Sequence, residues 1–145
     1  MKIDVMPGDI TKSDSDAIII NLFEGVTSPS GATGAVDKLL SNAISLLISD
    51  GEIKGKAGEM TLLHTMGRIT PKRVLIAGLG KQTDFSTERI RSVAADSVRY
   101  LENIGVTEAT TIAHGAGIGA QTAIDSGRAI SEGALLGLYK FNKYK

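Results

Sequence analysis

The residues of this sequence that can contact an anionic ligand lie in glycine-rich stretches and around one early aspartate. Residues 25–34 and 115–119 contain glycines that let a backbone approach a ligand closely, and backbone N–H groups at the start of a helix bind phosphate. Asp9 follows a Pro-Gly pair, and its carboxylate can accept a hydrogen bond from an amino group on a base or sugar. A flexible loop and a tight turn with a capping aspartate explain the same patterns, because a glycine-rich loop alone is a weak signal.

A third glycine-rich stretch and the two histidines indicate no further site. Residues 77–81 lack the spacing of the P-loop and of the dinucleotide fingerprint, so we expect Lys81 to be solvated. His64 and His114 lie 50 positions apart with no carboxylate at metal-ligand spacing, which predicts a structural role for His64 and no metal site. The sequence has no cysteine, so a disulfide, a thiolate zinc site and a cysteine nucleophile are excluded.

Composition and charge describe one folded domain, residues 1–145. Sixteen basic residues balance sixteen acidic ones, so no long-range positive field favours nucleic acid as a partner. No apolar run approaches the roughly 18 residues of a membrane span, and the first residues lack the apolar core of a signal peptide. We therefore expect a cytoplasmic protein with no membrane partner.

Short apolar runs alternate with longer helical patterns along the chain. The runs predict strands over residues 2–5, 17–20, 60–64, 74–77 and 109–113. The patterns between them predict helices over residues 33–50, 86–104 and 120–138. This order predicts an α/β fold of three layers, with a mixed, mostly parallel sheet covered by helices on both faces. Ligands bind such sheets at the carboxyl ends of strands, where glycine-rich loops lead into helices.

The helical patterns also predict which side chains face the sheet. In the first helix these are Val36, Leu39, Leu40, Ala43 and Leu47, and in the second they are Ile90, Val93, Ala94, Ser97, Val98, Leu101 and Ile104. Ser86 is placed to cap the second helix, and Phe85 and Ile90 have the spacing of a hydrophobic staple. Gly51 and Gly105 are expected to end the two helices.

The last helical pattern contains features that predict contacts with a neighbouring element. Gly127, Gly133 and Gly137 each disfavour a helix by about 1 kcal/mol relative to alanine, so we expect close approach of another backbone there. The aromatic and basic residues 139–145 are expected to pack against another chain or domain.

Two segments near the start, residues 8–11 (GDIT) and 16–21 (DAIIIN), resemble the opening of a macro domain, a module that binds ADP-ribose. Residues 31–36 and 115–119 resemble its two phosphate-side loops. The resemblance implies that Asp9 and Ile10 contact the base and that Asn21 contacts the ribose. The implied diphosphate-binding residues are Gly31, Gly34, Gly115, Gly117, Ile118 and Gly119. Glu24 stands where hydrolytic members carry a second asparagine, so hydrolysis of ADP-ribose is not implied.

Longer blocks resemble the N-terminal domain of the leucyl aminopeptidase family, the cytosol aminopeptidases. They are residues 36–40 (VDKLL), 54–59 (KGKAGE), 73–81 (RVLIAGLGK) and 132–141 (EGALLGLYKF), and together they cover almost the whole chain. This resemblance agrees with the first, because that N-terminal domain has a macro-like fold. It implies a domain that flanks a catalytic core and contributes to a hexamer.

The catalytic part of that family holds two divalent metal ions, zinc or manganese, and carries the signature Asn-Thr-Asp-Ala-Glu-Gly-Arg. This chain contains no such string and stops where the catalytic domain would begin, so no metal ligand or catalytic residue is implied for it. We expect a non-catalytic domain, inactive alone, that serves assembly or regulation with the catalytic domain or further copies as partners. The alternative is a stand-alone macro-like module that binds ADP-ribose or a related nucleotide.

Overall fold

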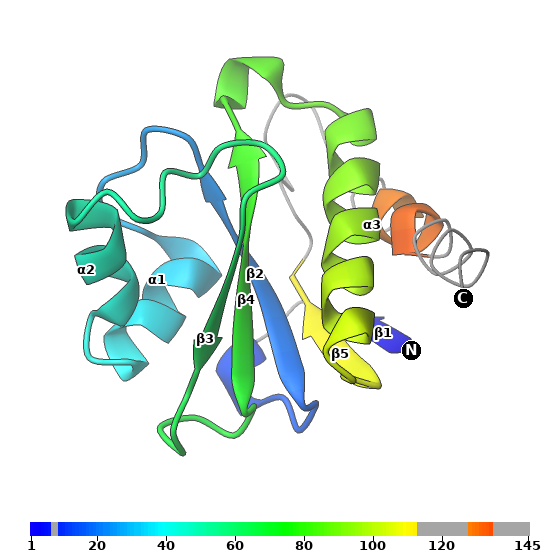
Figure 1. Cartoon of the computed structure of the whole chain (residues 1–145), viewed down its shortest axis with the longest axis horizontal. Helices are drawn as coiled ribbons and strands as arrows, with labels where there is room; N and C mark the ends of the chain where they lie inside the picture. Colours follow the sequence, from blue (N-terminus) through cyan, green and yellow to red (C-terminus); the bar gives the residue numbers. More distant parts are fainter. Residues whose placement is uncertain (7–8, 113–127, 135–145) are drawn as a thin grey trace.

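A computed structural model describes residues 1–6, 9–112 and 128–134, and these form one five-stranded sheet (Figure 1). The strands are β1 (Lys2–Val5), β2 (Ala17–Phe23), β3 (Met60–His64), β4 (Arg73–Gly80) and β5 (Glu108–Thr111), in the spatial order β1-β5-β2-β4-β3. All neighbouring pairs are parallel except β3 and β4, which are antiparallel. The predicted mixed, mostly parallel sheet is confirmed.

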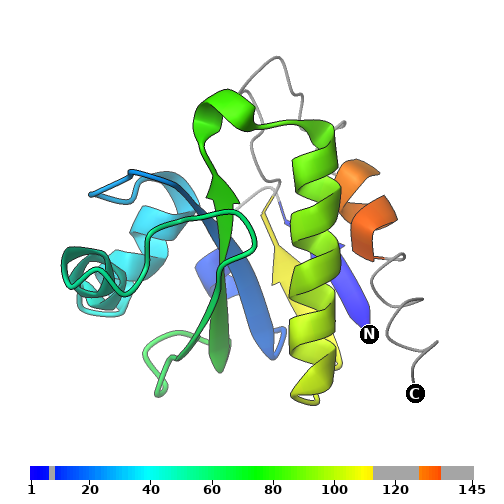
Figure 2. The ribbon, with the colours of Figure 1, turned by 45° about the horizontal axis from the view of Figure 1, so that its top comes forward.

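Helices cover both faces of the sheet, which confirms the predicted three layers. The α-helices are α1 (Gly31–Leu39), α2 (Ala43–Ser49) and α3 (Thr87–Asn103), and the short 3₁₀ helices are η1 (Ile10–Lys12) and η2 (Gln82–Asp84). α1 and α2 lie on one face, whereas α3 and the helical residues 128–134 lie on the other (Figures 1 and 2). Among the described helices none is long and apolar enough to span a membrane.

The two central strands, β2 and β4, carry the core because both of their faces are buried. Their side chains alternate between the layers: Ile18, Ile20, Val74 and Ile76 pack with Val36, Leu40 and Ile44, whereas Ile19, Leu75, Ala77 and Leu79 pack with Val93 and Leu101. A continuous apolar run is what such a doubly covered strand requires. β4 extends through Gly80, so most of the stretch 77–81 is strand rather than the loop expected after a shorter strand.

The predicted helix over residues 33–50 is wrong, because the chain turns sharply between α1 and α2. Ser41 and Asn42 have left-handed backbone angles, with φ of 57° and 63°. The buried carboxylate of Asp37 accepts hydrogen bonds from the N–H groups of Ile44 (2.8 Å) and Ser45 (3.0 Å), and so caps the start of α2. The break changes the buried face: Leu39, predicted to face the sheet, is 48% exposed.

α3 follows its sequence pattern closely. The Ser86 hydroxyl oxygen accepts a hydrogen bond from the Arg89 N–H at 3.2 Å, and Phe85 packs near Ile90 as the staple spacing predicted. The predicted inward residues are buried except Ile104, which is 39% exposed because the helix has already ended at that point. Gly105 follows with a φ of 84°, as expected for a glycine that ends a helix.

Residues 128–134 approach α3 more closely than a larger side chain would allow. A Cβ atom on Gly133 would lie 2.2 Å from the carbonyl oxygen of Arg91, so the predicted close approach is confirmed at this glycine. The Arg91 guanidinium also pairs with the Glu132 carboxylate at 2.7 Å, which raises the pKa of Arg91. Gly127, Gly137 and residues 139–145 lie outside the described residues, and so does the predicted end of the fifth strand at Ala113.

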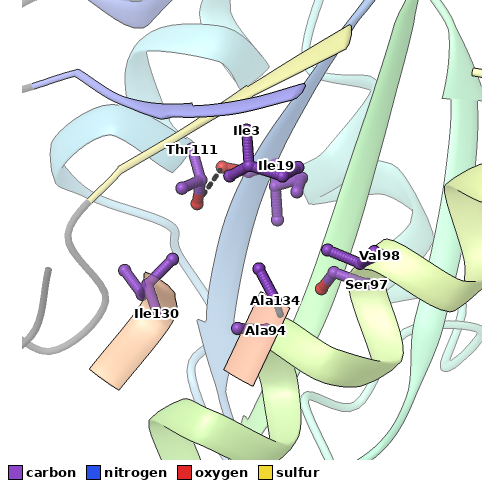
Figure 3. A pocket seen from close by; sticks show the side chains of 8 residues that line it. All are labelled: Ile3, Ile19, Ala94, Ser97, Val98, Thr111, Ile130 and Ala134. Atoms are coloured by element: carbon purple, nitrogen blue, oxygen red, sulfur yellow. Dashed lines mark hydrogen bonds between the residues drawn. The ribbon is translucent and has the colours of Figure 1, made fainter. Parts of the chain in front are cut away.

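A small cavity lies where these helices meet the sheet (Figure 3). It has a volume of about 10 Å³, room for a single water molecule, and its lining is mostly aliphatic. The polar groups at its wall bond to the backbone: the Ser97 hydroxyl donates to the Val93 carbonyl at 2.7 Å, and the Thr111 hydroxyl donates to the Ile19 carbonyl at 3.5 Å. The cavity is far too small for a nucleotide, so the candidate site must lie elsewhere.

Candidate functional site

The carboxyl end of β2 leads into α1, and at this junction the backbone of Asn21 meets the helical turn that contains Gly31 and Gly34. The Thr33 hydroxyl, buried in the first turn of α1, donates a hydrogen bond to the Asn21 carbonyl at 2.7 Å. Gly31 and Gly34 belong to the same turn, whose N-cap Ser30 offers no side-chain hydrogen bond within the described residues. The first N–H groups of a helix lack partners within the helix and favour an anion. The start of α1 is therefore the candidate anion site at this junction.

The backbone of this turn also requires glycine at these positions, independently of any ligand. Gly31 has a φ of 58°, in the left-handed region that glycine adopts without strain. A Cβ atom on Gly34 would lie 2.7 Å from the Pro29 carbonyl oxygen, so the loop itself requires a bare backbone there. The ligand-binding and the structural interpretations of residues 25–34 thus remain compatible.

Asp9 acts as a cap in this structure. Its Oδ1 atom accepts hydrogen bonds from the hydroxyl (2.5 Å) and the N–H (3.0 Å) of Thr11, at the start of η1. The Thr11 hydroxyl, followed by the Thr11 N–H, lowers the pKa of the exposed Asp9 carboxyl, which therefore stays ionised at neutral pH. Ile10 is buried against α1 with Val36, so only its backbone is left for a ligand.

The Asn21 side chain points to the face of the sheet opposite α1, although the Asn21 backbone contacts the start of α1. Side chains alternate along a strand, and Ile19 and Phe23 face the α3 layer, so Asn21 faces that layer too. The Phe23 ring packs edge-on against Phe85 with 5.2 Å between ring centroids. A ligand that used both Asn21 and the start of α1 would have to cross the end of β2. Gly115, Gly117, Ile118 and Gly119, the second predicted loop, lie outside the described residues.

The loop over residues 54–59 closes the carboxyl end of β4, a role that sequence reasoning did not assign to it. The Gly80 N–H donates to the Gly55 carbonyl and the Gly78 N–H donates to the Glu59 carbonyl, both at 2.8 Å. A Cβ atom on Gly78 would lie 2.0 Å from the Lys56 carbonyl oxygen. Gly78 is therefore explained by contact between two backbones, whereas a Cβ atom on Gly80, which has a φ of 76°, would lie 2.2 Å from the Arg89 guanidinium. Lys81 is exposed, as predicted.

Glu59 holds this loop in shape. Its Oε1 atom accepts hydrogen bonds from the N–H groups of Lys54 (3.0 Å) and Gly55 (2.9 Å). A Cβ atom on Gly55 would lie 2.5 Å from the Phe23 carbonyl oxygen, so the loop also touches the end of β2. No local sequence signal could have found this contact, because it joins two segments that are distant in the chain. Among the described residues, this loop therefore covers the carboxyl end of β4 and reaches that of β2.

The described residues do not fit a zinc or manganese site. Within residues 1–6, 9–112 and 128–134, no three histidine, aspartate or glutamate side chains gather around one point. His64, for which the sequence predicts a structural role, ends β3 in an exposed position. No step of metal-dependent hydrolysis is derived for these residues.

Comparison with known proteins identifies a matching family and similar proteins. Residues 19–145 match the family described as the cytosol aminopeptidase family, N-terminal domain. A probable cytosol aminopeptidase of Alkaliphilus oremlandii (strain OhILAs) is 37% identical over 147 residues, which cover 100% of this chain and 29% of that protein. The chain thus spans less than a third of the length of this relative.

Solved structures show the same fold. A mutant of tomato leucine aminopeptidase superposes with a TM-score of 0.72 at 20% identity, over 94% of this chain and 28% of the other. A Trypanosoma brucei macrodomain in complex with ADP-ribose superposes with a TM-score of 0.74 at 16% identity, over 95% of this chain and 58% of the other. At these identities the likeness establishes a macrodomain-like fold alone.

Proposed function

Because this chain belongs to the cytosol aminopeptidase family, we propose that it is a non-catalytic N-terminal domain that serves the assembly or regulation of a leucyl-aminopeptidase-type metallopeptidase. The observation that carries the proposal is the coverage: the whole chain matches, but it matches only 29% of a relative. In this proposal the zinc or manganese and the peptidase chemistry belong to the rest of such a protein, in the cytoplasm. The part of such a relative that this chain does not match is called the rest of the aminopeptidase.

The exposed apolar side chains support a role in assembly. Leu46 is 61% exposed and Met66 is 85% exposed, and both line the same groove. Single exposed apolar residues are common, whereas grouped ones mark contact surfaces. A domain with such a surface gains free energy when another domain or subunit covers it.

A chimeric enzyme tests this proposal. This chain replaces the stretch that it matches in the Alkaliphilus oremlandii protein, and a second variant lacks that stretch. We expect the chimera to have the assembled mass of the parent by light scattering and to cleave leucine p-nitroanilide with zinc or manganese. Turnover by the isolated 145-residue chain would contradict a non-catalytic role. A deletion variant that assembles and cleaves like the parent would contradict a role in assembly or regulation.

A nucleotide site is the second candidate, and the junction of β2 with α1 favours it. Asn21, Gly31 and Gly34 meet there, and the fold is that of a macrodomain solved with ADP-ribose. The proposed contacts are Asp9 and the Ile10 backbone with the base and Asn21 with the ribose. The diphosphate would lie against Gly31, Gly34, Gly115, Gly117, Ile118 and Gly119.

Calorimetry with ADP-ribose tests this candidate. Saturable binding that weakens at least tenfold in Asp9→Ala, but not in the exposed control Asp84→Ala, would support the site. Ligand at 100 times its Kd should also stabilise the fold by about 2.7 kcal/mol, which a thermal melt detects. An absence of heat at millimolar ADP-ribose would leave the glycines with their structural role only.

A further inference from the structure

A groove of about 380 Å³ lies between α2 and the edge strand β3. Its floor is apolar and comes from both elements: Leu40, Ala43 and Leu46 on the helical side and Leu63 on the strand. Leu46 is the most exposed of these side chains, at 61%. The groove is thus large enough for one or two apolar side chains from a partner and lies on the opposite side of the sheet's centre from α3 (Figure 1).

β3 offers a backbone edge beside this groove. In the part of the chain that the structure describes, β3 pairs with β4 only, at the end of the sheet. The N–H and C=O groups along the outer side of such a strand accept a further strand from another polypeptide. Leu63 faces the layer of α1 and α2, whereas Leu62 faces the α3 layer. An added strand would therefore place every second side chain at the groove.

Unfavourable backbone conformations gather at the same place. Ser41, Asn42 and Met66 are the non-glycine residues with positive φ among those the structure describes. Ser41 and Met66 line the groove, and Asn42 lies between two lining residues in the chain, Ser41 and Ala43. Residues held in sparsely populated conformations cluster at sites of contact, where the surrounding structure compensates for them. The backbone around this groove is therefore held in conformations that are unfavourable for these residues.

The charge of the groove selects the partner. Its lining contains Arg68 and His64 and no aspartate or glutamate. The Arg68 guanidinium donates a hydrogen bond to the Ser41 hydroxyl, and among the described residues no carboxylate pairs with it. An arginine at the rim of an apolar groove complements an aspartate or glutamate next to an apolar side chain.

We propose that the α2–β3 groove, lined by Leu40, Ala43, Leu46, Leu63 and Arg68, docks an extended acidic and apolar segment from the rest of the aminopeptidase. The segment adds a strand to β3, places an apolar side chain over Leu46 and Leu63, and pairs a carboxylate with Arg68. This inference rests on the proposed function and names its contact surface. The source is the rest of the aminopeptidase because a relative contains more than twice as much polypeptide outside the matched 29% as within it.

Photo-crosslinking in the chimera identifies the occupant. With p-benzoylphenylalanine in place of Leu46, we expect crosslinked peptides from the rest of the aminopeptidase that contain an aspartate or glutamate beside an apolar residue. The same group in place of Ile104, which is exposed at the end of α3, is the control and should not capture these peptides. Crosslinks to a second copy of this chain, or none at all, would overturn the proposal.

Charge reversal then measures the contribution of the groove. In the chimera, Arg68→Glu and Leu46→Lys should each weaken assembly at least tenfold, whereas Arg68→Lys should retain most of it. Lys81→Glu should have no effect, because Lys81 is exposed and follows the carboxyl end of β4, whereas His64 in the groove pairs with the first residue of that strand. Thermal melts of the isolated chain confirm that the variants fold, since both side chains are exposed. If the unaltered chimera fails to assemble, the proposed function fails; if the groove variants assemble normally, only this inference fails.

Discussion

Asp37 shows how a single side chain decides the path of the chain. It belongs to α1, yet its carboxylate accepts hydrogen bonds from two N–H groups and a hydroxyl at the start of α2. Charge-assisted hydrogen bonds of this kind are roughly twice as strong as neutral ones. A helix pattern that continues across residues 40–42 is thereby divided into two helices.

Asp37→Ala should destabilise the fold by about 2 kcal/mol, because it removes a helix cap and leaves buried N–H groups without a partner. Asp37→Asn keeps an oxygen in place and should cost about half as much. Urea unfolding followed by circular dichroism measures both. Asp50→Ala, an exposed change just after α2, is the matched control. An equal loss of stability in Asp37→Ala and Asp50→Ala would contradict the capping role.

Asp9 should make the stability of the fold depend on pH in the acidic range. Its carboxyl pKa lies below its ordinary value of 3.8 in the folded state because of the Thr11 hydroxyl and N–H. A group with a lowered folded pKa stabilises the fold above its unfolded pKa, and the contribution is lost as the pH falls through the folded pKa. We expect the difference in stability between the wild type and Asp9→Ala to be constant at neutral pH and to shrink under acid. A difference that grows on acidification would contradict this assignment.

At the scale of elements, the contact between residues 54–59 and β4 closes one part of the carboxyl edge. Two backbones meet there because Gly55 and Gly78 leave the space free, and Gly80 leaves room for the Arg89 guanidinium. Such a contact depends on residues distant in sequence. It explains why glycines that resemble a ligand loop are needed for packing in this fold.

Gly78→Ala should therefore destabilise the protein by about 3 kcal/mol, since its Cβ atom would lie 2.0 Å from a backbone oxygen that cannot move freely. Gly58→Ala is the matched control in the same loop. Gly58 has a φ of 83° and open space around it, so its substitution carries only the backbone strain, about 1 kcal/mol. Thermal melts compare the two variants. A smaller loss of stability in Gly78→Ala than in Gly58→Ala would show that the loop over residues 54–59 moves to make room for the added Cβ atom.

At the scale of the whole molecule, the balance of charge and the exposed groove act together. The formal net charge is zero, and the isoelectric point is about 6.7. Near that pH no net repulsion separates the molecules, so exposed apolar surface promotes association.

Light scattering should accordingly show the strongest attraction between isolated chains near pH 6.7, with weaker attraction on either side. Leu46→Lys adds a charge and removes an exposed apolar side chain, so it should reduce this attraction at neutral pH. Lys2→Gln serves as the control, since Lys2 is exposed on the opposite edge strand. Attraction that does not vary with pH would show that charge has no part in it.

The sequence alone determined most of the local structure and the family. Alternating and continuous apolar runs located the five strands that the structure describes, and a period of 3.6 located α3, because these patterns reflect which faces of an element are buried. The cap at Ser86 and the glycine at Gly105 were readable since they act within a few residues of themselves. Blocks such as 54–59 and 73–81 indicated the cytosol aminopeptidase family, which the match over residues 19–145 confirms.

Only the tertiary structure decided which residues distant in sequence contact one another. The turn at Ser41 and Asn42 was hidden, because the hydrogen bonds that Asp37 makes across it have no periodic signature. The role of Gly78 was hidden because it depends on a loop some twenty residues earlier. The groove exists because β3 ends the sheet beside α2, and strand order is set by packing over the whole chain. Local periodicity determines what an element is, whereas long-range contacts determine what it touches.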